Sequence, residues 1–253
     1  MISVFISHRA FESRRVFVRY CIYRHNRDFI IHRRLRKVIW KGKAAVQSSK
    51  RRSFMAKLYL IRHGETDYNN AMRFQGRTDI LLNQKGIEQA EKAAEFFRDI
   101  PLQAIYTSSL KRARTTAEII GKVKGLEPQA TDALQEMSFG IWENMNSKDI
   151  QKKYAKEWKD FFANPATTTI PQGECMLDVQ KRAYPVVQEI LDQYPEGDVA
   201  FVAHGGIIRV LICTMLGLDL NRAWHVHVGN ASITCFYYWG RSYTLDYANL
   251  TQY

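Results

Sequence analysis

Two histidines of this chain occupy the same kind of place, each after an apolar run and before a glycine. His63 follows the run 57–61, and His204 follows the run 199–203. Short apolar runs of this kind predict strands, and a continuous one is typical of a strand buried on both faces of a parallel sheet. Ligands of open α/β sheets bind beyond the carboxyl ends of the strands, and glycine allows a close backbone approach there. We therefore expect the two histidines to share one ligand site.

Two arginines indicate which ligand this site would take. Arg62 directly precedes the first histidine, and Arg112 opens a predicted helix after the next strand. Guanidinium groups match the oxygens of a phosphate with paired hydrogen bonds. Alone, Arg112 would be assigned to a solvated helix face, and one histidine at a strand end is more often structural. The repeated strand–His–Gly arrangement together with the arginines favours a phosphate site.

The elements that must position these residues alternate between strands and helices from Met55 onward. Asn83 is a plausible N-cap for the first long helix, and Gly125 ends the second. The predicted strands are 57–61, 104–107, 199–203, 232–239 and 243–248, and the predicted helices are 83–99, 109–124, 174–194 and 207–216. Repeated βα units predict one three-layer α/β/α domain with a mostly parallel central sheet, covering residues 55–253.

The segment 134–171 is less regular, and its aromatic residues (Trp142, Trp158, Phe161 and Phe162) are expected to pack in the core or under a lid rather than to form a stacking platform. His225 and His227 form an H-x-H pair, but no third ligand is apparent, so no metal site is predicted.

The ordered set of motifs resembles the histidine phosphatase superfamily, the phosphoglycerate mutase-like enzymes, across residues 57–250. Arg-His-Gly alone is a weak signal, whereas the ordered set is specific. The matching segments are 60–66 (LIRHGET), Asn69, 73–76 (RFQG), 108–113 (SSLKRA), 134–136 (LQE), 139–143 (FGIWE), 171–174 (PQGE), 203–206 (AHGG) and 229–233 (GNASI).

This resemblance implies a role for each candidate residue. His63 would attack phosphorus and carry the phosphoryl group as a phosphohistidine. Arg62, Arg112 and His204 would surround the phosphoryl oxygens. Glu136, which by itself would be assigned to an exposed loop, would protonate the leaving oxygen and then activate water. The positions that would hold phosphate or substrate oxygens are Asn69, Gln75, Gly76 and Gly205.

A hydrolase and a mutase of this kind share the first half-reaction and differ in the acceptor of the phosphoryl group. Only 68 positions separate Glu136 from His204, which looks short beside the mutases, and the motifs look more like those of small phosphatases of the α-ribazole phosphatase type. We therefore expect a phosphomonoester hydrolase acting on a small phosphorylated metabolite, for example α-ribazole phosphate or a sugar phosphate. A cofactor-type phosphoglycerate mutase is the alternative, and a non-catalytic phosphate-binding scaffold is a further one.

The net charge of +12 belongs entirely to the first 54 residues. They hold 15 lysines and arginines against Glu12 and Asp28, a net of +13, so the remainder has a net charge of −1. The basic stretch could be a nucleic-acid or membrane arm, a transit peptide, or translation from an upstream start with Met55 as the native initiator. We favour the last reading and expect residues 1–54 to be disordered or foreign to the native protein. The body is not expected to bind nucleic acid.

The hydrophobic fraction, the longest apolar run and the cysteines limit the classes of protein to which this chain can belong. At 46% hydrophobic residues the chain can form a packed core, and its longest apolar run, 210–218, is too short to span a bilayer. The four cysteines, at 21, 175, 213 and 235, show no C-x-x-C spacing, which favours a reduced, cytoplasmic compartment. We expect no cofactor, no metal and no membrane partner. The sequence leaves open whether the chain forms a homodimer.

Overall fold

The computed structural model describes residues 19–25, 28–34 and 56–253. The chain divides into two units, residues 1–51 and 52–253. In the first unit, β1 (Arg19–His25) and β2 (Asp28–Arg34) form an antiparallel pair, which the sequence did not lead us to expect. The rest of the basic stretch lies outside the described residues. The interpretation of residues 1–54 as disordered or foreign remains a prediction.

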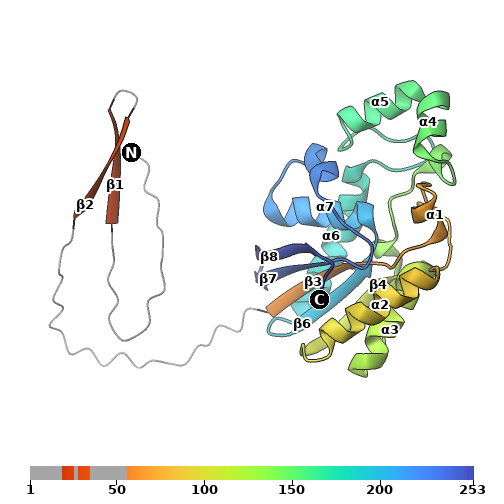
Figure 1. The fold of residues 1–253 in the computed structure, drawn as a ribbon, viewed down its shortest axis with the longest axis horizontal. Coiled ribbons are helices and arrows are strands. Elements are labelled where there is room, and N and C mark those ends of the chain that lie inside the picture. The colour runs from red at the N-terminus through yellow and green to blue at the C-terminus, as the bar shows by residue number, and fades with distance from the viewer. Residues whose placement is uncertain (1–18, 26–27, 35–55) are drawn as a thin grey trace. The chain divides into compact units, whose positions relative to one another are not determined.

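The second unit is built on a six-stranded sheet with the order β5-β4-β6-β3-β7-β8 (Figure 1). The four strands from β5 to β3 run parallel to one another, whereas β7 and β8 are antiparallel to their neighbours. The bounds are β3 Ala56–Arg62, β4 Leu102–Ser108, β5 Gln129–Thr131, β6 Asp198–Ala203, β7 Ile233–Trp239 and β8 Ser242–Leu250. The predicted mostly parallel sheet is confirmed, and β5 is an additional edge strand.

Helices cover both faces of this sheet because the strands are apolar on both sides. In β3, Leu58 and Leu60 belong to the core under one face, and Tyr59 and Ile61 to the core under the other. The first core also contains residues of α6 (Met176–Gln193) and α7 (Gly205–Leu216). The second contains residues of α2 (Gln84–Phe97) and α3 (Lys111–Lys124). The predicted three-layer α/β/α architecture is confirmed.

The ends of two predicted helices have the expected chemistry. The Asn83 side chain accepts a hydrogen bond from the Gly86 N–H and so caps α2. Gly125, with φ of +65°, ends α3 in the left-handed conformation. These local signals fix where the helices begin and end beside the sheet.

The segment between β4 and β6 contains several short elements that periodicity did not predict. They are η1 (Asp132–Leu134), η2 (Gly140–Trp142), α4 (Ser147–Lys153) and α5 (Ala155–Ala163); outside this segment, α1 (Asp67–Asn70) and η3 (Leu220–His225) were also not predicted. Trp142 and Phe161 are fully buried in the first core, with Trp158 packed against it. The expected packing role is confirmed for these three residues, whereas Phe162 is 36% exposed and lies outside the core.

None of the helices within the described residues combines the length and apolar character needed to cross a membrane.

Candidate active site

The register of the sheet brings the two histidines together. β3 and β6 are neighbours in which Arg62 pairs with Ala203, so the residue after each strand lies at the same edge of the sheet. The His63 N–H donates to the Ala203 carbonyl at 3.0 Å, and the ring centroids of His63 and His204 are 5.1 Å apart. The expectation that both histidines belong to one site agrees with this geometry.

His63 has the tautomer and charge of a nucleophile. Its Nδ1 lies 2.6 Å from the Gly64 carbonyl oxygen; a carbonyl only accepts, so Nδ1 carries the proton and the Nε2 lone pair is free. Burial, reinforced by Arg112 and Arg62, lowers the pKa of His63 well below its ordinary value. The imidazole is therefore neutral at physiological pH.

The turn after His63 requires glycine. A Cβ on Gly64 would stand 2.2 Å from the Gly86 carbonyl oxygen at the start of α2, a distance that real Cβ atoms do not adopt. The main chain after His63 is thus packed directly against a helix. The Asn230 side chain adds to this by donating from Nδ2 to the carbonyls of His63 and Gly64, both at 3.3 Å.

His204 is fully buried behind His63 and does not itself line the cavity described below. Its Nε2 lies 2.8 Å from the Ser108 hydroxyl oxygen, which already accepts from the Leu110 N–H. Burial, Arg112 and His63 lower the pKa of His204, so this ring is neutral as well. We assign its proton to Nδ1, which has no partner in the described part of the chain.

The two predicted arginines are held by main-chain carbonyls. Arg112, 1% exposed, donates to the carbonyls of Thr78 and Gly76, both at 2.8 Å. Arg62 donates to the Val228 carbonyl at 2.8 Å. Burial lowers the pKa of each to about 10, so both remain charged at neutral pH. Arg112 is therefore a buried member of the site and not a solvated helix residue.

Glu136 is a buried carboxylate, 8% exposed, and not an exposed loop residue. Its Oε2 accepts from the Gly206 N–H at 3.0 Å, and its Oε1 accepts from Ile207 at 3.2 Å and Met137 at 2.9 Å. The first two donors are unpaired N–H groups at the beginning of α7, where a negative charge is stabilised. A Cβ on Gly206 would stand 2.6 Å from Oε1, so the close approach depends on that glycine.

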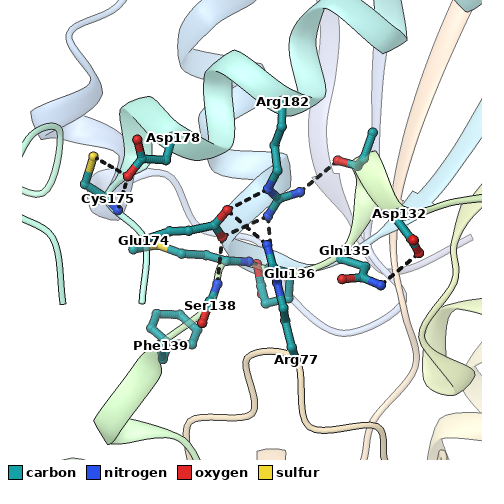
Figure 2. Close-up of polar contacts among 12 residues, drawn as sticks. Arg77, Asp132, Gln135, Glu136, Ser138, Phe139, Glu174, Cys175, Asp178 and Arg182 are labelled. Atoms are coloured by element: carbon teal, nitrogen blue, oxygen red, sulfur yellow. Dashed lines mark hydrogen bonds and ion pairs between the residues drawn. The ribbon is translucent and has the colours of Figure 1, made fainter. Parts of the chain in front are cut away.

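An ion pair from α6 holds the loop that carries Glu136 (Figure 2). Arg182 donates from Nη2 to the Glu136 carbonyl at 3.0 Å and from Nη1 to the Ala133 carbonyl at 2.8 Å. The same guanidinium pairs with both carboxylate oxygens of Glu174, at 2.9 and 3.1 Å. Glu174 in turn accepts from the Ser138 N–H at 2.8 Å. Glu136 is thus bracketed on both sides by contacts to one Arg–Glu pair.

A cavity of about 170 Å³ opens at this place, and eight of the nine predicted site residues line it. These are Arg62, His63, Asn69, Gln75, Gly76, Arg112, Glu136 and Gly205, and the ninth is His204. Sequence reasoning did not identify the remaining lining residues, which are Met72, Arg73, Phe74, Phe139, Gly206, Arg209 and Trp224.

The predicted oxygen-binding residues have free donors. Asn69 accepts at Oδ1 from Asn230 and from the Thr66 main chain, which orients the amide and leaves Nδ2 for a ligand. Gln75 is buried, and within the described residues neither its acceptor Oε1 nor its donor Nε2 forms a hydrogen bond, so Nε2 is free to donate. Gly205 is the first residue of α7, and its N–H is of the kind that a helix leaves unpaired. Asn230 lies in the matching segment 229–233, and that segment is the signal that could have identified it.

The H-x-H pair is not part of this cavity, and both histidines are exposed. Among the residues that the structure describes, no group of three or more His, Cys, Asp or Glu side chains is arranged to hold a metal ion.

Comparison with known proteins identifies the same family that the sequence motifs resemble, and the match covers most of the second unit. The family description "Histidine phosphatase superfamily (branch 1)" matches residues 58–251. Phosphoserine phosphatase 1 of Hydrogenobacter thermophilus is 30% identical over 78% of this chain and 93% of its own length. A probable phosphoglycerate mutase of Erwinia tasmaniensis is 32% identical over 71% of this chain and 84% of its own.

Solved structures share the fold of this chain at sequence identities close to those of the relatives above. A mycobacterial glucosyl-3-phosphoglycerate phosphatase, solved with vanadate (VO3), superposes with a TM-score of 0.72 at 31% identity, covering 77% of this chain and 99% of that one. A protein of Escherichia coli, provisionally described as an α-ribazole-5′-phosphate phosphatase, has a TM-score of 0.71 at 25% identity, covering 78% of this chain and 97% of that one.

Proposed function

This chain belongs to the histidine phosphatase superfamily and is a phosphatase, and from that premise we propose that it hydrolyses a small phosphorylated metabolite through a phosphohistidine on His63. The observation that carries the proposal is the convergence of a neutral, unprotonated Nε2 and two buried guanidinium groups on one cavity. A phosphate dianion would be neutralised there, with phosphorus open to attack by His63.

In the first half-reaction, His63 Nε2 forms a bond to phosphorus and the P–O bond to the leaving group breaks. Arg62 and Arg112 stabilise the charge that spreads over the phosphoryl oxygens. The leaving oxygen takes a proton from Glu136.

In the second half-reaction, the ionised Glu136 accepts a proton from water, and the water oxygen attacks phosphorus. The P–N bond breaks, which returns His63 to its neutral form and releases inorganic phosphate. The three main-chain N–H groups that donate to Glu136 hold its carboxyl group in place. One residue thus serves as acid and then as base.

The identity of the substrate is a separate part of the proposal. α-Ribazole phosphate and sugar phosphates remain our predicted candidates. The phosphoserine phosphatase and the probable phosphoglycerate mutase among the similar proteins support adding phosphoserine and phosphoglycerate to them. A mutase remains the alternative, supported by the similarity to a probable phosphoglycerate mutase. Its phosphohistidine would pass the phosphoryl group to a second hydroxyl instead of water.

One experiment tests the proposal and separates these alternatives. The purified chain is mixed with each candidate phosphomonoester, and free phosphate is followed beside an acid-labile, alkali-stable phosphoenzyme. We expect phosphate release and a phosphohistidine that is absent from His63→Ala. Conversion of 3-phosphoglycerate to 2-phosphoglycerate without phosphate release would favour the mutase. A failure to turn over any phosphoester would favour a binding scaffold.

A further inference from the structure

Two of the four arginines that line the cavity are not used by the proposed mechanism, and these are the exposed Arg73 and the more buried Arg209. Arg209 lies in α7, five positions after His204, and lines the cavity with Arg62 and Arg112. It was not among the candidate residues from the sequence, where it reads as one polar residue within an apolar helix.

Two contacts fix the Arg209 side chain. Its Nε donates to the Val226 carbonyl at 2.9 Å, and its guanidinium carbon lies 5.1 Å from the centroid of the Trp224 ring. Within the described part of the chain, Arg209 forms no ion pair with a carboxylate, and neither of its terminal nitrogens donates a hydrogen bond to a protein acceptor. The edge formed by Nη1 and Nη2 is therefore available to a ligand.

Arg209 lies close to the phosphate site, next to Gly205. The point where a Gly205 Cβ would stand is 2.8 Å from Arg209 Nη1 and 3.5 Å from Arg62 Nε. The two guanidinium groups repel each other, and Arg209 is the largest of the charges that lower the pKa of Arg62. Burial lowers the pKa of Arg209 as well. The four arginines that line the cavity exceed the combined negative charge of Glu136 and a phosphate dianion by one.

We propose that Arg209 binds a carboxylate of the substrate, so that the enzyme selects phosphomonoesters of small carboxylic acids over their neutral counterparts. The free Nη1–Nη2 edge matches the two oxygens of a carboxylate. The cavity volume of about 170 Å³ is below the roughly 300–1,000 Å³ of pockets that enclose larger ligands, which favours a compact acid over a bisphosphate or a nucleotide. This inference rests on the proposed function.

The experiment uses substrate pairs that differ only in the acid group. O-phosphoserine is paired with phosphoethanolamine, and 3-phosphoglycerate with glycerol 3-phosphate. Both kcat and KM are measured for the intact chain, Arg209→Met and Arg209→Lys. The control is Arg222→Met, which changes an exposed arginine of η3 outside the cavity. Thermal unfolding of each variant shows whether it is folded.

We expect the intact chain to prefer the acid of each pair, and Arg209→Met to lower kcat/KM for that acid by about 10- to 100-fold, mainly through KM, as loss of a charge-assisted pair implies. The neutral partner should lose much less, so the preference largely disappears. Arg209→Lys should retain part of it, and Arg222→Met all of it.

Equal losses on both members of a pair would overturn the proposal, because Arg209 would then act on the phosphoryl group or on folding. An unchanged preference in folded Arg209→Met would also overturn it. Binding of 3-phosphoglycerate and glycerol 3-phosphate to His63→Ala, with and without Arg209→Met, is measured by calorimetry. That measurement needs no turnover, so it tests the carboxylate site even if the proposed hydrolysis fails.

Discussion

The two halves of the proposed chemistry are positioned in different ways. The phosphate end consists of His63, Arg62 and Arg112, which stand at or just after the ends of strands and donate to main-chain carbonyls. The proton-transfer end consists of Glu136, which lies in an irregular loop and is fixed by α7 and by the Glu174–Arg182 pair. The first depends on the sheet, and the second depends on contacts between distant parts of the chain. We therefore expect the two ends to respond to different substitutions.

The largest effect should come from the phosphate end. Replacing His63 by Ala removes the group that bonds to phosphorus, so kcat should fall on the order of 10⁴- to 10⁶-fold for every substrate. Steady-state rates and the phosphoenzyme assay measure this. Residual turnover with an undiminished phosphoenzyme would mean that another residue is the nucleophile.

The next effect separates the two ends by the leaving group. Glu136→Gln keeps the phosphate end and removes the proton donor, so phosphorylation by an alkyl phosphate should slow by about 10²–10⁴-fold. With p-nitrophenyl phosphate, whose phenolate needs no proton, the first turnover should be much less impaired. Rapid quench measures that turnover apart from the steady state. Equal losses with both substrates would show that Glu136 is not the acid.

A smaller effect tests how Glu136 is positioned. Arg182→Met removes the contacts to the Glu136 loop, so the alkyl phosphate should lose about 10- to 100-fold in kcat, the usual consequence of a small displacement of a catalytic group. Adding Arg182→Met to Glu136→Gln should then cost little more, because the positioned group is already inactive. The matched control is Arg241→Met, from an exposed ion pair with Asp192. Additive losses in the double variant would assign Arg182 a role in folding alone.

The buried histidines of the phosphate end should make stability depend on pH. Both pKa values are lowered on folding from an ordinary value of 6.5, so the unfolded chain binds protons that the folded chain excludes. Their contribution is complete above about pH 6.5 and declines as the pH falls. The free energy of unfolding should be about 2–3 kcal/mol lower at pH 5.5 than at pH 7.5.

Denaturant unfolding at both pH values measures this difference. His63→Gln should remove about half of it, whereas substitution of the exposed His225 should leave it unchanged. An identical pH dependence in His63→Gln would contradict the assignment of the effect to the buried pair.

The smallest expected effect is that of metal removal. Arg62 and Arg112 supply the positive charge that Mg²⁺ supplies in many phosphoryl-transfer enzymes. EDTA should therefore leave the rate unchanged, while vanadate, which adopts the five-coordinate geometry of the transition state, should inhibit. Inactivation by EDTA that a divalent cation reverses would refute the metal-independent mechanism.

The contrast between the phosphate end, which depends on the sheet, and the proton-transfer end, which depends on contacts between distant parts of the chain, explains what could be predicted from the sequence. The sheet, its layers and the phosphate end were predictable because strand periodicity, glycine turns and helix caps are local signals, and His63 and Arg112 lie directly beside them. The short helices α4 and α5 were missed although local signals exist for them, because Asn146 caps α4 as Asn83 caps α2, and α5 is amphipathic. Arg209 and Arg182 could not be assigned because their roles depend on which distant carbonyls and rings they contact, and spacing along the chain does not encode those contacts.

The hydrogen bonds between Glu136 and the start of α7 have a consequence for how this protein can evolve. Active sites often trade stability for activity, so substitutions that inactivate an enzyme often make it more stable. Here the carboxylate that we propose to transfer protons also caps the helix that follows His204. Loss of its charge weakens the fold and the reaction together. Selection for stability and selection for a high catalytic rate therefore act in the same direction at this position.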